Sequence, residues 1–257
     1  MSAGLDRSIR FVFDSVVDAY VSGRPDMPLE AVLGGAVAVG LEPGARVLEI
    51  GSGAGQLTAT LLGAGFEVVA LEPGDALRTR AAVRAPKAVF HAETFEDFDP
   101  RHRFDAIFSS NAFHWVDPDV GYGKAAGVAD ALVLMWNTPF VADAVLRRRV
   151  QEEVMIPHGS TFPTEEADVR RFVADEIAAA ADLIRDSGRF EKPWSHVYER
   201  TLQYTPQRYR DLIGSMGSVA ASEDYAEILA ELRPVLGTEP FELVDLVWVV
   251  AARARAH

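Results

Sequence analysis

A glycine-rich loop is the segment of this sequence best suited to hold a ligand. It spans Glu49–Gly55 and places glycine at Gly51, Gly53 and Gly55. Glycine lets the backbone turn sharply and approach a ligand closely, because no Cβ stands in the way. A predicted helix starts at Gln56, directly after the loop, and its first N–H groups are free to meet a polar or anionic ligand. The loop therefore predicts a ligand site at the junction of a strand and a helix.

An acidic residue stands where such a loop needs one. Glu72 ends the next predicted strand, and doubly wound folds place a carboxylate about 20 residues after the loop to bind both ribose hydroxyls of a nucleoside. A dinucleotide fingerprint would have its third glycine at position 56, where this chain has Gln56. The spacing favours a nucleoside ligand other than a dinucleotide, and a nicotinamide-dependent oxidoreductase is the rival interpretation.

His114 is the side chain best suited to acid–base chemistry. It follows a predicted strand and so lies at the carboxyl edge of the sheet, where open α/β sheets bind ligands. An imidazole with the ordinary pKa of about 6.5 removes a proton from a hydroxyl or amine near neutral pH. We predict His114 as a catalytic base. The neighbouring Trp115 offers the alternative that the two rings pack together as the floor of a pocket.

These residues need a scaffold, and the first half of the chain supplies one. Its apolar runs and turn residues alternate in the pattern of an α/β fold, with a doubly wound, Rossmann-like parallel sheet and helices on both faces. From residue 142 to 186 the apolar spacing is helical, and strands resume after Pro193. The predicted strands span residues 46–50, 66–71, 88–91, 103–108, 131–136, 195–204 and 241–251.

We predict a single domain over residues 1–257, because no linker, repeat or low-complexity segment interrupts the chain. Its predicted parts are an N-terminal lid segment (1–29), a cofactor-binding core (30–138), a helical cap (139–193) and C-terminal strands with inserted helices (194–257).

Several segments resemble one enzyme superfamily. The loop reads Glu-x-Gly-x-Gly-x-Gly, which resembles motif I of the class I S-adenosylmethionine-dependent methyltransferases. Other segments resemble its small-molecule branch, which includes methyltransferase type 11 and trans-aconitate methyltransferase-like enzymes. The resemblance implies a seven-stranded sheet with an antiparallel last strand, and S-adenosylmethionine as the cofactor. The segments that carry the branch resemblance are Phe13–Pro28, Leu71–Pro73, Ala92–Phe95 and Ser110–Trp115.

The resemblance also implies how the cofactor is held. The loop glycines would pass under the methionine moiety, Glu93 would meet the adenine amino group, and the backbone carbonyl of Asn111 would accept from the ammonium group. Tyr20 and Arg24 would close over the ligand, with a surface ion pair as the alternative for Arg24. Leu77 would cover an adenine face or be an ordinary packed helix residue. The residues assigned to the cofactor are Tyr20, Arg24, Glu49, Gly51, Gly53, Gly55, Glu72, Pro73, Leu77, Glu93, Thr94 and Asn111.

The predicted reaction is an in-line methyl transfer to a small molecule, with an oxygen acceptor, hydroxyl or carboxylate, favoured by the branch resemblance. A protein of the same fold that binds the cofactor but no longer transfers methyl is the alternative. Trp194, His196 and Tyr198 alternate on a predicted strand and are expected to border the acceptor pocket from the side. The residues predicted to line that pocket are Phe113, His114, Trp115, Trp136 and Phe140.

Composition narrows the partners. The 38 acidic residues exceed the 25 basic ones, a net charge of −13 that repels nucleic acid and anionic membranes. The one basic cluster, Arg147–Arg149, is interpreted as the solvated face of a helix. The longest apolar run, Leu246–Ala252, is too short to span a membrane. The chain has no cysteine and no metal-ligand spacing of histidines, so we predict a cytoplasmic protein without a metal.

Overall fold

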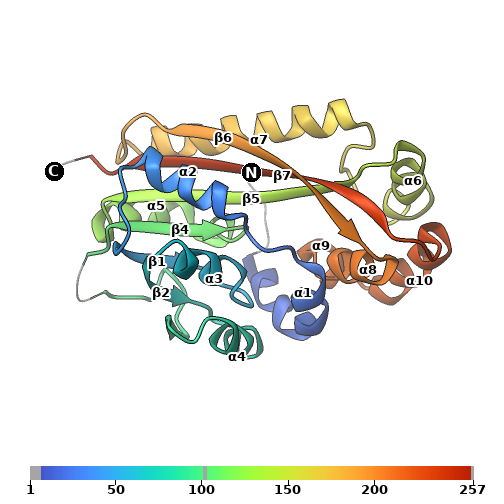
Figure 1. The fold of residues 1–257 in the computed structure, drawn as a ribbon, viewed down its shortest axis with the longest axis horizontal. Helices are drawn as coiled ribbons and strands as arrows, with labels where there is room; N and C mark the ends of the chain where they lie inside the picture. The colour runs from blue at the N-terminus through green and yellow to red at the C-terminus, as the bar shows by residue number, and fades with distance from the viewer. Residues whose placement is uncertain (1–6, 101–102, 256–257) are drawn as a thin grey trace.

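The computed structural model describes residues 7–100 and 103–255, and contains one seven-stranded sheet (Figure 1). Residues 1–6 of the predicted lid segment and 256–257 of the predicted C-terminal part lie outside the described residues. The strand order is β3-β2-β1-β4-β5-β7-β6. The first five of these strands are parallel, and β7 runs antiparallel to both of its neighbours. The predicted fold class is therefore confirmed. The strands are β1 (Arg46–Ile50), β2 (Glu67–Leu71), β3 (Val89–His91), β4 (Ala106–Ser110), β5 (Ala131–Val141), β6 (Trp194–Tyr204) and β7 (Phe241–Arg253).

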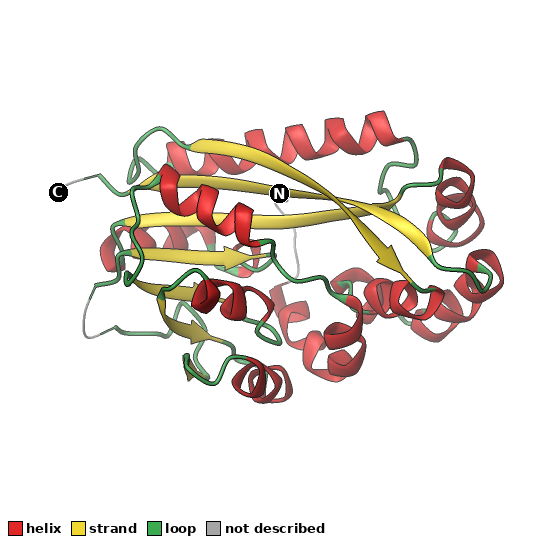
Figure 2. Ribbon diagram, viewed as in Figure 1, coloured by secondary structure: helices red, strands yellow, loops and turns green. Residues whose placement is uncertain are grey.

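Helices cover both faces of the sheet (Figure 2). On one face α2 and α3 pack against strand residues such as Val47 and Phe108. On the other face α5 and α7 pack against Leu48, Ile107 and Leu132. Neighbouring residues of a strand point to opposite faces, which is why the central strands are apolar throughout. The helices are η1 (Arg7–Val16), α1 (Val17–Gly23), α2 (Leu29–Ala38), α3 (Gln56–Gly63), α4 (Asp75–Arg84), η2 (Phe113–Trp115), α5 (Pro118–Val128), α6 (Ala144–Arg149), η3 (Val150–Met155), α7 (Glu166–Asp186), α8 (Pro206–Gly214), α9 (Gly217–Ala220) and α10 (Tyr225–Leu236).

Strand β5 is longer than the sequence predicts. The prediction ends at residue 136, but the strand continues to Val141 and pairs with β7 over its whole length. Its pairing with β4 stops at Met135, so the last part has a neighbour on one side only. A proline is tolerated at such an unpaired edge, which explains why Pro139 does not end the strand. The predicted cap therefore begins inside a strand of the sheet.

The longest helix of the predicted cap does not lie over the carboxyl edge. Helix α7 runs along the face of the sheet beside β6 and β7 (Figure 1). Its residues Val169, Val173, Ala180 and Ile184 are buried in the same core as the sheet. The extended ends of β5 and β7 carry a separate apolar cluster instead, formed with α6, η3, α8, α9 and α10. These shorter helices cover the carboxyl edge, and among the described residues no helix has the length and apolarity to cross a bilayer.

Candidate functional site

The glycine loop depends on glycine at two of its three positions for close contacts. Gly51 and Gly53 have φ values of 72° and 56°, in the left-handed region that side chains rarely adopt. A Cβ on Gly53 would lie 2.6 Å from the Tyr20 hydroxyl, and one on Gly51 would lie 2.4 Å from the Ala112 Cβ. Both strain and space therefore exclude other residues, as the ligand prediction requires.

Gly55 has a different role from the one predicted. Its φ is also positive, at 86°, but it faces the backbone of α4, where a Cβ would lie 3.0 Å from the Ala81 Cα. It does not border either of the cavities beside the loop. The absence of a side chain at Gly55 thus permits close packing against α4, and the structure does not place Gly55 on the wall of the two cavities.

The carboxyl group of Glu72 is buried against the loop. Its Oε2 accepts a hydrogen bond from the Gly53 N–H at 2.8 Å, and its Oε1 accepts from the Gly74 N–H at 2.9 Å. Burial raises the pKa of Glu72 to about 7, although the two N–H donors oppose this shift. The predicted acid is therefore placed at the loop and fixed by it.

Buried polar atoms without partners surround the start of α3. Glu49 Oε2 accepts from the Thr58 hydroxyl at 2.6 Å, but its Oε1 has no hydrogen-bond partner among the described residues. The same is true of Ser52 Oγ and Gln56 Nε2. Burial raises the pKa of Glu49 to about 8. Because buried polar atoms are normally paired, these three indicate that a polar ligand binds here.

Two small cavities lie end to end along the loop, and we call them together the loop crevice. One, of about 70 Å³, is bordered by Glu49, Ser52 and Gln56. The other, of about 90 Å³, is bordered by Glu72 and the ends of the neighbouring strands. Tyr20, Arg24, Gly51, Ser110 and Asn111 border both, so the two form one elongated site. Apart from Gly55, every residue predicted for the cofactor borders it: Tyr20, Arg24, Glu49, Gly51, Gly53, Glu72, Pro73, Leu77, Glu93, Thr94 and Asn111.

The N-terminal segment is fastened to helix α4, which follows Glu72. Asp14 Oδ1 accepts from the Leu77 N–H at 2.9 Å, and Arg80 forms an ion pair with Asp18 at 2.8 Å. Asp14 thus supplies the carboxylate at the start of α4. The N-cap position of α4 is Gly74, and Asp75 in the first turn pairs with Arg78.

Arg24 is bound to the residue that follows α8. Its Nε donates to the Ser215 hydroxyl at 2.9 Å, and its Nη2 donates to the Ser215 carbonyl at 2.7 Å. The guanidinium also lies 5.2 Å from the centre of the Tyr20 ring. The alternative of a surface ion pair is therefore wrong, because the partners are a serine and an aromatic ring at the crevice.

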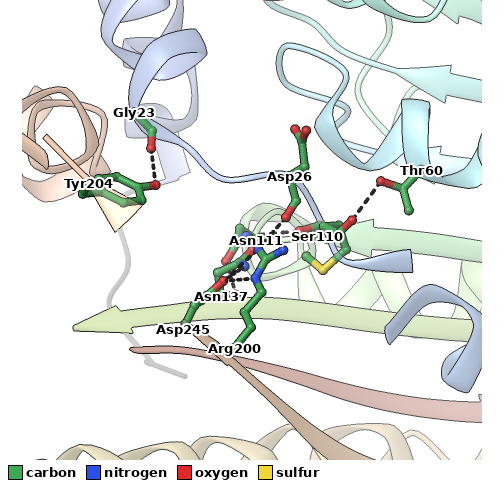
Figure 3. A network of polar contacts seen from close by, with 10 residues as sticks. Gly23, Asp26, Thr60, Ser110, Asn111, Asn137, Arg200, Tyr204 and Asp245 are labelled. Atoms are coloured by element: carbon green, nitrogen blue, oxygen red, sulfur yellow. Dashed lines mark hydrogen bonds and ion pairs between the residues drawn. The ribbon is translucent and has the colours of Figure 1, made fainter. Parts of the chain in front are cut away.

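Asn111 adopts a strained backbone at the middle of the crevice. Its φ is 51°, and it is the one residue other than glycine with a positive φ in the described part of the chain. Its side chain exchanges hydrogen bonds with Asn137, whose amide donates to Asp245 Oδ2 at 3.0 Å. Arg200 donates to the same oxygen at 2.9 Å and to the Asp26 carbonyl at 2.5 Å (Figure 3). This buried network joins the crevice to β6, β7 and the N-terminal segment.

A much larger cavity adjoins the loop crevice, with a volume of about 1100 Å³; we call it the large cavity. The rings of Trp136 and Trp248 stack along it, with centroids 4.2 Å apart and planes 15° apart. Of the predicted pocket residues, Trp115 borders the loop crevice instead and packs edge-on against Phe13, 5.9 Å between centroids. The predicted pocket residues that border the large cavity are Phe113, His114, Trp136 and Phe140.

The aromatic residues of β6 lie elsewhere. Tyr198 points towards α2, with its hydroxyl beside Gly34, and Trp194 and His196 stack next to it on the same face. Strand β6 forms the edge of the sheet beyond β7, and these three side chains do not border the large cavity. The expectation that they border the acceptor pocket is therefore wrong. Strand β7 lies between β5 and β6, and the sequence does not reveal this strand order.

His114 is partly buried in the wall of the large cavity. Trp136 Nε1 donates to His114 Nδ1 at 3.4 Å. Burial, and then the positive charge of Arg24, lower the pKa of His114 to about 4. A neutral imidazole has one unprotonated nitrogen, and here Trp136 occupies it. This arrangement disfavours the predicted base and leaves His114 Nε2–H as a hydrogen-bond donor.

Arg147 is not on a solvated helix face, contrary to the sequence interpretation. It is 5% exposed, and its donors bind the carbonyls of Val141, Ala142 and Thr164 at 2.7–3.0 Å. Arg148 and Arg149 do face outward, each in an ion pair with a glutamate. The three arginines follow one another, but the helix turns only the first towards the large cavity.

Comparison with known proteins finds a family match for the region around the loop. Residues 47–130 match a family model described as a methyltransferase domain. The match and the sheet topology agree with S-adenosylmethionine as the cofactor, as predicted. Among the described residues, no group of three or more potential ligands for a metal ion is present.

Similar proteins align with this chain over a third to nine-tenths of its length. An uncharacterized methyltransferase of Mycobacterium tuberculosis is 28% identical over 246 residues, which cover 91% of this chain and 89% of that protein. A ubiquinone biosynthesis O-methyltransferase of Bradyrhizobium diazoefficiens is 33% identical over 90 residues, 33% of this chain and 36% of that protein. A solved structure assigned as a type II methyltransferase of Anaeromyxobacter dehalogenans has a TM-score of 0.63 at 18% identity, covering 91% of this chain and 99% of that one. It shows the same fold.

Proposed function

We propose that this chain is a cytoplasmic enzyme of the small-molecule, trans-aconitate-like branch. It transfers the methyl group of S-adenosylmethionine to an oxygen of a small molecule rather than to nucleic acid. One observation carries the proposal: the loop crevice and the large cavity share a wall. Asn137, Pro139, Leu212 and Met216 border both. An acceptor in the large cavity would therefore lie next to the methionine end of the crevice.

The chain's own residues suit the two ends of the cofactor. Glu72, held by two N–H groups, would bind the ribose, while Leu77 and Glu93 border the adenine end. The unpartnered oxygen of Glu49 and the backbone of Asn111 would meet the ammonium group, since both border the methionine end. Arg24 is held by Ser215 and would place its charge near the carboxylate.

The reaction requires alignment more than acid–base chemistry. The bound cofactor would supply a methyl group on a positively charged sulfur. A lone pair of the acceptor oxygen would attack the methyl carbon in line, and the sulfur would leave with the C–S electron pair as a neutral thioether. Holding two reactants in the right geometry contributes on the order of 7–11 kcal/mol to lowering a barrier. His114 Nε2–H would hold the acceptor oxygen, while Trp136 keeps the other ring nitrogen occupied. A carboxylate acceptor is already ionised, so this arrangement needs no base.

Calorimetric titration with S-adenosylmethionine and S-adenosylhomocysteine tests the proposal. The wild type should bind both in the micromolar range, about −8 kcal/mol. Glu72→Ala should weaken binding at least tenfold, whereas Glu67→Ala, on the exposed first residue of β2, should not. Failure of the folded wild type to bind either ligand would overturn the proposed function. Binding without methyl consumption over a broad panel of oxygen acceptors would favour a protein that has lost transfer.

A further inference from the structure

The large cavity exceeds what a compact metabolite needs. Its volume of about 1100 Å³ lies above the range of about 300–1,000 Å³ that is usual for small-molecule sites. Several aromatic rings contribute to its lining. Trp136 stacks on Trp248, and Phe162 meets Phe172 edge to face at 5.8 Å between centroids. Aromatic pairs prefer such stacked and edge-on arrangements, so this lining favours a planar aromatic ligand.

Strand β5 runs from the loop crevice along the wall of the large cavity. It borders the crevice at Asn137 and Pro139, and it borders only the large cavity at Phe140 and Val141. Strands advance about 3.3 Å per residue, so Val141 lies about 7–13 Å along the strand from the two residues at the crevice. Neither α6 nor η3 contributes a residue to the loop crevice. They form the end of the cavity remote from the methyl-transfer point.

A buried polar group without a partner lies at this remote end. Gln151, on the π-helix η3, is 8% exposed, and its Oε1 has no hydrogen-bond partner among the described residues. It borders the large cavity beside Arg147, one turn earlier on α6. Arg147 is occupied by three carbonyls, which hold the end of β5 in place. A buried acceptor left unpaired is unfavourable, and π-turns occur frequently at functional sites.

We propose that the acceptor is an extended aromatic molecule with a hydroxyl group at the end remote from the methylated oxygen, and that Gln151 binds this hydroxyl. A hydroxyl donates to Gln151 Oε1 and keeps its own lone pairs free to accept. The methylated oxygen would lie about 7–13 Å away along β5, which matches a skeleton of two rings. This inference rests on the proposed function for which end of the acceptor faces the cofactor. The binding of the aromatic rings in the large cavity does not depend on it.

Two probes that differ in one atom test the role of Gln151. They are 4′-hydroxybiphenyl-4-carboxylate and biphenyl-4-carboxylate, titrated calorimetrically with and without S-adenosylhomocysteine. The hydroxylated probe should bind wild type about tenfold more tightly, the ratio that one hydrogen bond of ordinary strength provides. In Gln151→Leu the ratio should fall below about twofold, while Gln151→Glu, which keeps an acceptor, should retain it. Glu152→Gln, exposed on the same helix, is the matched control.

The outcomes separate this inference from the proposed function. Equal affinity of the two probes for wild type would overturn the role of Gln151. Tighter binding of 12-hydroxydodecanoate than of either biphenyl would overturn the aromatic acceptor. If the probes bind as expected but neither cofactor form does, the cavity assignment stands and the proposed function fails. Thermal unfolding of Gln151→Leu within a few degrees of wild type shows that its loss of discrimination is local.

Discussion

The loop crevice and the large cavity share a wall, yet they are built in opposite ways. The crevice is narrow, it is formed around backbone turns, and most of its residues lie between Glu49 and Asn111. The cavity is wide, and its residues come from segments as far apart as Phe113 and Trp248. Local segments therefore set which cofactor binds, whereas the packing of distant elements sets which acceptor binds. Substitutions on the two sides should affect different ligands.

The largest effect is expected from a side chain placed in the glycine loop. Gly53→Val puts a branched Cβ into a backbone with φ of 56° and against the Tyr20 hydroxyl. We expect affinity for S-adenosylhomocysteine to fall about a thousandfold, roughly 4 kcal/mol, in calorimetric titration. Gly63→Ala is the control, because a Cβ there meets nothing within 4 Å. Unchanged affinity in Gly53→Val would show that the crevice is not the cofactor site.

The buried acid of the crevice should make stability depend on pH. The pKa of Glu49 is raised by burial to about 8 in the folded chain, against about 4.3 in an unfolded one. The folded state therefore holds a proton that the unfolded state has released. The stabilisation is complete below about pH 4 and is lost as the pH rises towards 8. Chemical denaturation should show the free energy of unfolding falling on the order of 3 kcal/mol between pH 5 and 8.

Glu49→Gln should remove about half of the slope between pH 5 and 8, because glutamine does not titrate, whereas Glu72, with a pKa raised by burial to about 7, also takes up a proton on folding. Glu67→Gln, at the exposed start of β2, should leave the slope unchanged. An unchanged slope in Glu49→Gln would contradict the protonation of Glu49 in the folded chain.

The large cavity offers its own test in two neighbouring arginines. Arg147→Met leaves the carbonyls of Val141, Ala142 and Thr164 without their donor, and we expect a loss of about 2 kcal/mol in the free energy of unfolding. Arg148→Met removes an ion pair between solvent-exposed side chains, and such pairs contribute little to stability. Thermal unfolding compares the two variants, and equal losses would contradict the buried role of Arg147. Affinity for the cofactor should stay unchanged in both.

The same contrast explains what the sequence predicts well. Glu72, Glu93 and Asn111 follow successive strands, and parallel strands bring their carboxyl ends to one edge, so local spacing places them correctly. The spacing does not reveal the role of Gly55, because its neighbour Ala81 belongs to a helix further along the chain.

Long-range contacts account for the other errors and omissions. Arg24 meets Ser215 across 191 positions of sequence, and Asp14 caps a helix that starts about sixty residues later. No local pattern signals either contact. The aromatic residues of β6 are misassigned for the same reason, since the insertion of β7 beside β5 moves β6 to the far edge.

The smallest effect, on kcat/KM, is expected from substitutions of His114. As a hydrogen-bond donor it should be replaceable by asparagine, so His114→Asn should keep kcat/KM for a carboxylate acceptor within about threefold of wild type. His114→Ala should lose about tenfold. Removal of a general base would lower the rate of both variants by about 10²–10⁴-fold and would abolish the acid limb of the pH profile.

Trp136→Phe sharpens the comparison, because it frees His114 Nδ1 and should raise the imidazole pKa. If activity then gains an acid limb that His114→Asn lacks, the indole of Trp136 holds the histidine in its donor form.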